Sequence, residues 1–138
     1  MKGIIRVIGA LEAHLVPWFL VLPRPSLAWR IPTIQNLLKK QHIHLHHPDF
    51  CQYGVRWKKS TTIMSSRIDP LNAQRLDLKC RPSRNGLCSA TKKFHVKLDG
   101  HNKSGYKMAS IAAGIPQHLA RDLSFCLIDD YRSSAGFS

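Results

Sequence analysis

Acidic residues are scarce in this chain, with 8 Asp and Glu against 21 Lys and Arg in 138 residues. Thirteen of the cations and three of the acids fall in residues 51–107, which therefore carry +10 of the formal net charge of +13. A charge of this size opposes compaction unless a polyanion is nearby. The composition therefore favours nucleic acid as a partner, then an anionic membrane surface, with a basic protein that has no such partner as the third alternative.

Several signatures of enzymes and membrane proteins are also absent. The sequence has no G-x-G-x-x-G or P-loop for nucleotide phosphates, no internal repeat, and no Ser/His/Asp set or promising pair of carboxylates. No run reaches the roughly 18 uncharged apolar residues of a membrane span. Residues 1–22 imitate a secretory signal, but Glu12, His14 and Pro17 interrupt the apolar segment. We expect no membrane partner, and a secreted or membrane-anchored basic protein is kept as an alternative.

Cysteine is sparse as well, and four residues are too few for a disulfide scaffold, so we expect reduced thiols and an intracellular protein. The loop over residues 80–95 has little apolar content and needs an external staple to hold one shape. Three thiolates and one imidazole suit tetrahedral zinc, and the candidate ligands are Cys51, Cys80, Cys88 and His95. The spacing is wider than a C-x2-C knuckle. The alternative is four unrelated residues, with Cys51 as a small buried hydrophobe.

Residues 41–47 are rich in histidine and alternate between polar and apolar side chains. On a strand, His42, His44 and His46 share one face, followed by His47. We interpret this face mainly as a polar surface that gains charge below neutral pH, because Asp49 is the one carboxylate nearby. A metal site built on these imidazoles is the alternative.

The apolar pattern predicts an α/β order of elements. Helical spacing predicts helices over residues 3–15, 33–40, 70–78, 108–114 and 116–127, with Thr33 as the cap of the second. Apolar or alternating runs predict strands over residues 18–22, 41–47, 61–64 and 94–98, the first of them buried and parallel. Residues 50–55 are predicted as a strand or turn, 79–92 as a loop, and 133–138 as a frayed tail.

The most unusual segment is residues 49–61, with the sequence DFCQYGVRWKKST. A strand that only needed a core would place aliphatic residues at alternate positions. Tyr53 and Trp57 instead bracket Gly54, and Arg56, Lys58 and Lys59 surround the second ring. Aromatics mixed with cations are typical of surfaces that contact phosphate and stack on bases. A strand and turn whose lysines face water is the alternative.

Four motifs together resemble the C-terminal half of cytosine-C5-type DNA methyltransferases of the kind associated with phages, viruses and retroelements. Residues 17–29 resemble P-W-x-x-E-N-P-x-x-S-x-x-W, and residues 49–61 resemble D-x-C-Q-Y-G-x-x-W-R-K-x-T. Residues 80–100 resemble a C…C-S…H-x-x-L-x-G stretch, and residues 112–123 resemble a closing A-x-x-Y-P-x-x-L helix with Ile115-Pro116 in place of Tyr-Pro.

The resemblance implies a Rossmann-like domain that binds S-adenosylmethionine and a basic segment that contacts DNA. The Glu-Asn pair of the family falls on Val21 and Leu22, which cannot hydrogen-bond a base. The Gly-rich and Pro-Cys loops would lie before Met1, so S-adenosylmethionine is expected only if an upstream methyltransferase segment completes the protein. The residues that carry over as nucleic-acid-facing are Gln52, Tyr53, Arg56, Trp57, Lys58, Lys59 and Thr61.

We therefore predict an α/β fold with a partial Rossmann-like methyltransferase domain and a basic, loop-rich C-terminal portion. The single incomplete domain divides into a Rossmann-like segment (1–48), a basic and zinc-stapled DNA-facing segment (49–107) and C-terminal helices (108–132). The expected function is DNA binding by a methyltransferase-like fragment that is inactive alone. The alternative within the binding class is an independent zinc-stapled basic module for DNA or RNA.

Overall fold

The computed structural model describes residues 2–99 and 114–134 of the chain. The helices are α1 (Lys2–Ala13), α2 (Pro32–Leu38), α3 (Pro70–Ala73) and α5 (Gln117–Ser134), with short 3-10 turns η1 (Leu27–Arg30), η2 (Phe50–Tyr53) and η3 (Gln74–Leu76). The strands are β1 (Trp18–Pro23), β2 (Ile43–His46) and β3 (Thr61–Ser66).

The three strands form one antiparallel sheet in the order β1-β3-β2. β3 is the central strand, and all six of its residues are buried. Leu20 lies opposite Met64 in the β1–β3 pair, and Leu45 lies opposite the same residue in the β2–β3 pair. The prediction of a parallel strand at residues 18–22 is therefore wrong. The Rossmann-like fold is not confirmed, because the described strands contain no parallel pair.

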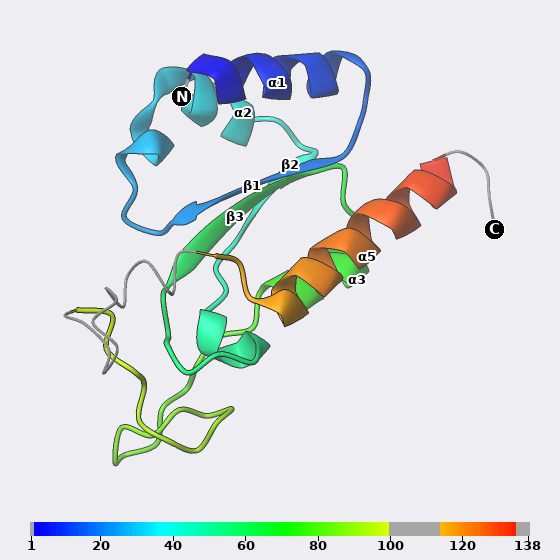
Figure 1. Ribbon diagram of the computed structural model, residues 1–138. Coiled ribbons are helices and arrows are strands. Elements are labelled where there is room, and N and C mark those ends of the chain that lie inside the picture. The colour runs from blue at the N-terminus through cyan, green and yellow to red at the C-terminus, as the bar shows by residue number, and fades with distance from the viewer. Residues whose placement is uncertain (1, 100–113, 135–138) are drawn as a thin grey trace.

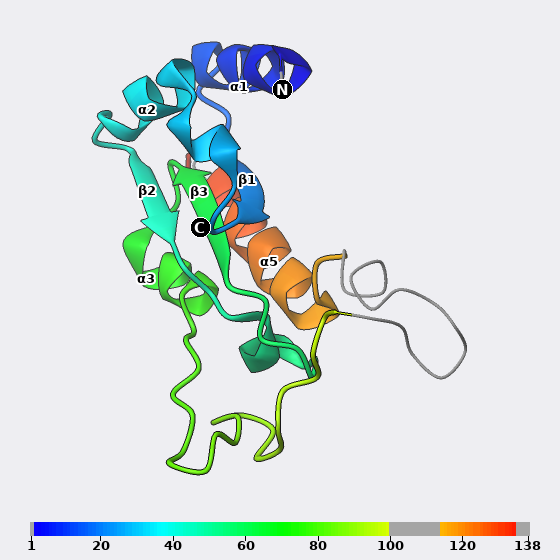
Figure 2. The same ribbon diagram turned by 90° about the vertical axis from the view of Figure 1, so that its left-hand side faces the viewer.

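Helices cover both faces of the sheet, with α1 and α2 on one side and α3 and α5 on the other (Figures 1 and 2). Alternation along β3 sends Met64 to the first face and Ile63 to the second. Met64 packs with Ile8 of α1 and Ile34 of α2, whereas Ile63 belongs to a separate cluster completed by α5. β1 contributes to both faces in the same way, which explains why its sequence is apolar throughout.

Most predicted elements are confirmed in kind and shifted at their ends. The helices expected over 3–15 and 116–127 are α1 and α5, and the strands expected over 41–47 and 61–64 are β2 and β3. α2 begins at Pro32 with Ile31 as its N-cap, so the prediction of Thr33 as the cap is wrong. Pro at the first position suits a helix start because its missing N–H has no helical acceptor there.

Residues 50–55 form the 3-10 turn η2 and a left-handed Gly54, in agreement with the turn alternative of that prediction. Two other predictions differ from the structure. Residues 94–98 form no strand. The expected helix 70–78 is divided into α3 and η3. The helix predicted at 108–114 lies outside the described residues except for its last position, and so does most of the predicted tail.

Gly54 sets the distance between η2 and α5. Its φ of 91° lies in the left-handed region, and a Cβ at this position would stand 2.9 Å from the ring of His118 on α5. A side chain would therefore be strained and would also collide with that ring. The glycine of the DFCQYG segment is required for packing.

Candidate metal centre and its basic surroundings

Three cysteines and one histidine converge at the end of the molecule that lies below the sheet in Figure 1. Cys51 comes from η2, whereas Cys80, Cys88 and His95 come from the long loop that follows η3. One ligand atom from each residue lies within 4.8 Å of all the others, and the three cysteines are buried. This buried cluster could hold a metal ion such as zinc.

The separations match what a tetrahedral ion requires. Bonds of the usual Zn–S and Zn–N lengths place two sulfurs about 3.8 Å apart, and a sulfur and a nitrogen about 3.5 Å apart. The Sγ atoms of Cys80 and Cys88 are 4.0 Å apart, and Sγ of Cys80 is 3.5 Å from Nε2 of His95. All four cysteines of the chain are free thiols. The predicted ligand set is therefore brought together in space, although its members span 45 positions of sequence.

Gln52 and Ser89 add hydrogen bonds to the sulfurs. Nε2 of Gln52 donates to Sγ of Cys51 at 3.4 Å, to Sγ of Cys88 at 3.9 Å and to Oγ of Ser89 at 3.1 Å. Ser89 in turn donates its hydroxyl to Sγ of Cys80 at 3.7 Å. Donors around a metal thiolate orient it and lower its charge density. The amide of Gln52 therefore faces the cysteine cluster, and its role as a nucleic-acid contact stays a prediction.

The thiols differ in acidity. Burial, helped by the neighbouring thiols of Cys80 and Cys88, raises the pKa of Cys51 to about 12. Burial acts in the same direction on Cys88, but hydrogen bonds from the backbone and hydroxyl of Thr91 and the backbone of Ala90 outweigh it and lower that pKa to about 6. A divalent cation would stabilise all three thiolates together, because a coordinating thiol is deprotonated outright.

Asp49 connects the loop of Cys80 to the sheet. Asp49 is buried, with 4% of its surface exposed. Its carboxylate accepts hydrogen bonds from the Cys80 N–H at 2.8 Å and from the Ser60 hydroxyl at 3.1 Å. The guanidinium of Arg24 forms an ion pair with the same carboxylate, with a guanidinium nitrogen 3.8 Å from Oδ1. Ser60 directly precedes β3, so this one acid links the first loop cysteine to the central strand. Sequence reasoning missed Asp49 because its partners are distant along the chain.

The residues predicted to face nucleic acid do not form one exposed strip. Tyr53 and Thr61 are 2% exposed, and the Tyr53 hydroxyl donates to the Arg75 carbonyl at 2.8 Å and accepts from the Leu78 N–H at 3.1 Å. Trp57 is half-buried and packs against the core cluster on the α5 side. Tyr53 and Thr61 are therefore structural residues, and Trp57 does not present an open ring.

The cations of that segment are placed differently from one another. Arg56 is exposed, and its guanidinium donates to the Phe94 carbonyl at 3.4 Å. Lys58 and Lys59 are half-buried, and Nζ of Lys59 stands 5.8 Å from the centroid of the Phe50 ring. The three cations therefore differ in exposure and in their contacts.

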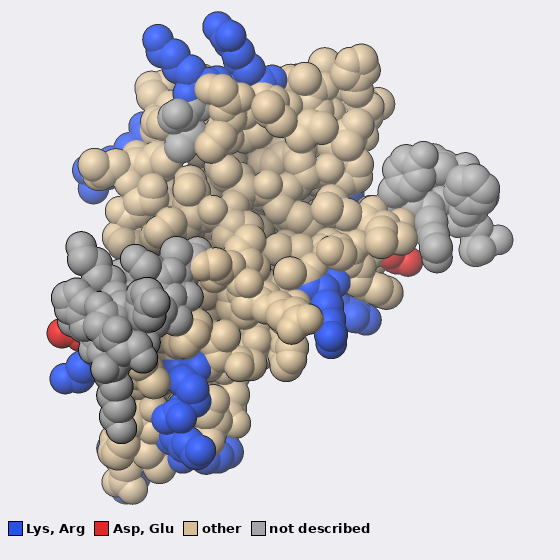
Figure 3. All heavy atoms as spheres, in the orientation of Figure 1, with Lys and Arg blue, Asp and Glu red and all other residues tan. Residues whose placement is uncertain are grey.

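Six exposed cations lie on or beside the loop that carries Cys80, Cys88 and His95. Figure 3 shows Lys and Arg atoms over the lower end of the molecule, where this loop lies. Among the residues that the structure describes, none of these cations forms an ion pair. We call them the loop cations: Arg56, Arg81, Arg84, Lys92, Lys93 and Lys97.

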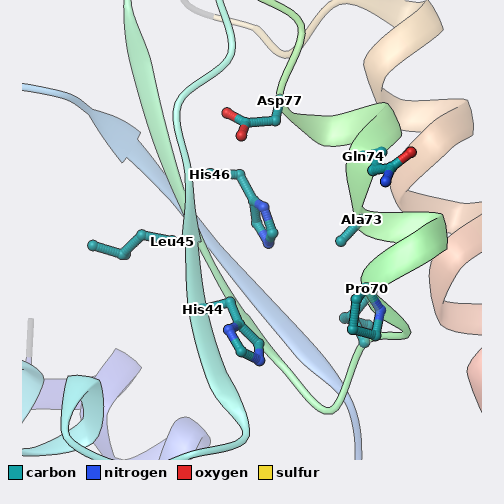
Figure 4. Close-up of a pocket in the computed structure, with 8 residues that line it drawn as sticks. His44, Leu45, His46, Pro70, Ala73, Gln74 and Asp77 are labelled. Carbon is teal, nitrogen blue, oxygen red and sulfur yellow. The ribbon is translucent and has the colours of Figure 1, made fainter.

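The histidine segment forms no second cluster of ligands in the described part of the chain. His46 is buried and shares a hydrogen bond of 2.8 Å with the Ser65 hydroxyl, and burial lowers its pKa. His44 and His46 line a hollow of about 230 Å³ between β2 and α3, with Asp77 at its rim (Figure 4). Leu45 points to the opposite side of the strand in the same view.

Comparison with family models, curated proteins and solved structures found no match to this chain. The described helices include none that is long and apolar enough to cross a membrane. The resemblance to DNA methyltransferases therefore stays a prediction.

Proposed function

We propose that this chain is a nucleic-acid-binding module whose basic loops are held in shape by a zinc ion on Cys51, Cys80, Cys88 and His95. The observation that carries the proposal is the convergence of these ligands within a loop region that has little other internal support. Zinc is favoured over other divalent ions because a set of three thiolates and one imidazole is a common structural zinc site.

The loop between η3 and residue 99 needs such support because it has no helix or strand of its own. Its hydrophobic cluster consists of the three cysteines themselves. An apolar core of ordinary side chains is thus replaced by sulfur. Metal binding contributes its free energy directly to folding when the site does not exist in the unfolded chain.

The charge of this loop supports a polyanionic partner. The loop cations lie on or beside the segment that carries Cys80, Cys88 and His95, and within the described residues none of them forms an ion pair with a carboxylate. Fixing these cations in one geometry lowers the entropy cost of meeting a phosphate backbone. A partner with regularly spaced phosphates, DNA or RNA, fits such a surface better than a single small anion.

Metal analysis of protein purified without a histidine tag tests the staple. We expect one zinc per chain, loss of that zinc in Cys88→Ala, and full retention in Cys126→Ala. Cys126 is the matched control because it is also buried but lies outside the cluster, on α5. Wild-type protein that contains no zinc and cannot be loaded with it contradicts the proposal.

Salt-dependent binding tests the basic surface. Log affinity for a mixed-sequence oligonucleotide should fall linearly with log salt, by roughly 0.7–0.9 for each phosphate contacted. Arg84→Ala combined with Lys93→Ala should reduce that slope by about 1.5, because two contacts are lost. The control is Arg30→Ala combined with Lys39→Ala, which removes the same charge from exposed positions of the α2 layer. Equal losses in both double variants would show that only net charge matters.

A methyltransferase origin is a separate proposal. It is compatible with DNA binding, and it expects no chemistry from this chain, since Val21 and Leu22 stand where the resemblance requires Glu and Asn. Transfer of labelled methyl groups from S-adenosylmethionine to DNA by the isolated chain would contradict this expectation.

A further inference from the structure

Phe94 is an exposed aromatic residue within the zinc-ligating loop. Phe94 is 65% exposed, and it stands in the sequence directly between Lys93 and the candidate ligand His95. The other strongly exposed phenylalanine of the described chain is Phe125 on α5, at 42%. That ring is covered by Arg75, whose guanidinium carbon stands 4.2 Å from the ring centroid. Within the described residues, no cation stands over the Phe94 ring in this way.

The backbone that carries Phe94 is braced on both sides. Arg56 donates to the Phe94 carbonyl at 3.4 Å, and the Val96 N–H donates to the Arg56 carbonyl at 2.9 Å. His95 belongs to the metal cluster, with Nε2 at 3.5 Å from Sγ of Cys80. The ring edge approaches the turn at Gly86, where an added Cβ would stand 3.9 Å from Cε1 of Phe94. The ring is therefore presented to solvent from a fixed support.

We propose that Phe94 stacks on an unpaired nucleobase, so that the module prefers single-stranded nucleic acid to a duplex. This inference rests on the proposed function. Single-strand-binding surfaces combine cations that follow the phosphates with aromatic rings on which bases stack. Here Lys92, Lys93 and Arg56 supply the cations beside one open ring. In a duplex the base faces are occupied by their neighbours, and a ring can reach them only at the cost of unstacking.

The inference reassigns the stacking role within the module. Tyr53 is buried and Trp57 packs inward, so neither aromatic of residues 49–61 offers a free face. Phe94 lies 37 positions after Trp57 in sequence, yet Arg56 holds its carbonyl. The aromatic and the cation that were expected side by side in one segment are thus brought together from two loops.

Fluorescence anisotropy with labelled oligonucleotides tests the inference. The probes are a fifteen-residue oligo-dT, the matching oligo-rU, and a dA·dT duplex of the same length, with zinc content measured for every variant. Stacking is worth about 1–3 kcal/mol per base, so Phe94→Ala should weaken single-strand binding by roughly 5- to 150-fold. Duplex binding should change by less than a factor of about two. Phe94→Trp should retain affinity, and Phe125→Ala should leave it unchanged.

The outcomes separate this inference from the proposed function. Wild-type protein that binds oligonucleotides and loses nothing in Phe94→Ala overturns the stacking role and leaves the module intact. Equal losses on single strand and duplex overturn it as well. Wild-type protein that binds no probe overturns both proposals. The oligo-dT and oligo-rU arms distinguish DNA from RNA as the source of the base.

A measurement on the unmodified protein covers the case in which Phe94→Ala fails to fold or loses zinc. An oligonucleotide that carries 5-iodouracil forms a covalent adduct with a stacked aromatic ring on irradiation. We expect the adduct on Phe94 when the digested complex is sequenced by mass spectrometry. Adducts confined to other residues would overturn the inference.

Discussion

The carboxylate of Glu12 connects α1 to the sheet through several polar contacts. Oε1 accepts hydrogen bonds from Trp18 Nε1 at 2.9 Å and from the Ser66 hydroxyl at 2.6 Å, while Oε2 lies 2.7 Å from His42 Nε2. Lys40 stands 3.8 Å away. Only 10% of the Glu12 side chain is exposed. Four partners from three segments, namely β1, β3 and the connection between α2 and β2, therefore meet at one acid.

Glu12→Gln is expected to destabilise the fold by an amount that follows from its pKa. Burial acts to raise the pKa of Glu12, but the hydrogen bonds from Ser66, His42 and Trp18 outweigh it and hold the pKa at about 2, against 4.5 for a free side chain. A shift of this size corresponds to about 3 kcal/mol of folding free energy at neutral pH. The glutamine amide removes the negative charge and replaces one acceptor oxygen by a donor NH2 group. The loss of folding free energy in Glu12→Gln should therefore approach about 3 kcal/mol at neutral pH.

Urea unfolding at several pH values measures the effect. Because the folded pKa is depressed, the stabilisation is complete above pH 4.5 and disappears as the pH falls towards 2. Wild type and Glu12→Gln should therefore differ most at pH 7 and converge near pH 2. Asp99→Asn is the matched control, since Asp99 is exposed. A constant difference at all pH values, or no difference at pH 7, would refute the reasoning.

Three further predictions follow from other contacts. Gly54→Ala should destabilise the protein by about 1–3 kcal/mol in thermal unfolding, because φ is 91° and the new Cβ collides with the His118 ring. Adding His118→Ala should restore only the stability lost to that collision. Full restoration would argue against backbone strain at residue 54. Burial lowers the pKa of His46, so stability should be complete above pH 6.5 and decline below it, and an NMR titration midpoint at or above 6.5 would contradict this. Metal-free protein treated with a mild oxidant should join Cys80 to Cys88, whose sulfurs are 4.0 Å apart, whereas zinc should protect both thiols; peptide mapping that finds no such bond in the metal-free form would be against the cluster geometry.

Local sequence patterns predicted most of the helices and strands but not how the strands pair. The apolar spacing of α1 and the continuous run of β1 can be recognised within a few residues. The direction of β1 cannot, because a strand covered by helices on both faces has the same composition whether its neighbour is parallel or antiparallel. The choice depends on β3, which begins 38 positions after the end of β1.

For the candidate site as well, the sequence predicts which residue types could bind a metal but not where the neighbouring side chains lie. Cys51, Cys80, Cys88 and His95 could be predicted because few roles other than metal binding require three thiols and an imidazole. The positions of Gln52 and Tyr53 could not. An amide suits a sulfur as well as a base, and the hydrogen bonds of the Tyr53 hydroxyl come from residues 22 and 25 positions away. Phe94 was expected within a strand, but it lies in a loop beside His95 of the candidate metal cluster.

The two faces of the sheet are completed at different times during synthesis. The side that holds Met64 draws only on residues that precede the end of β3, whereas the side that holds Ile63 is closed by Leu119 and Cys126 of α5. A nascent chain that has not yet released α5 from the ribosome therefore carries a bare apolar surface, and such surfaces recruit chaperones or self-associate. Translation that stops before residue 117 should yield an insoluble product even when every metal ligand has been made.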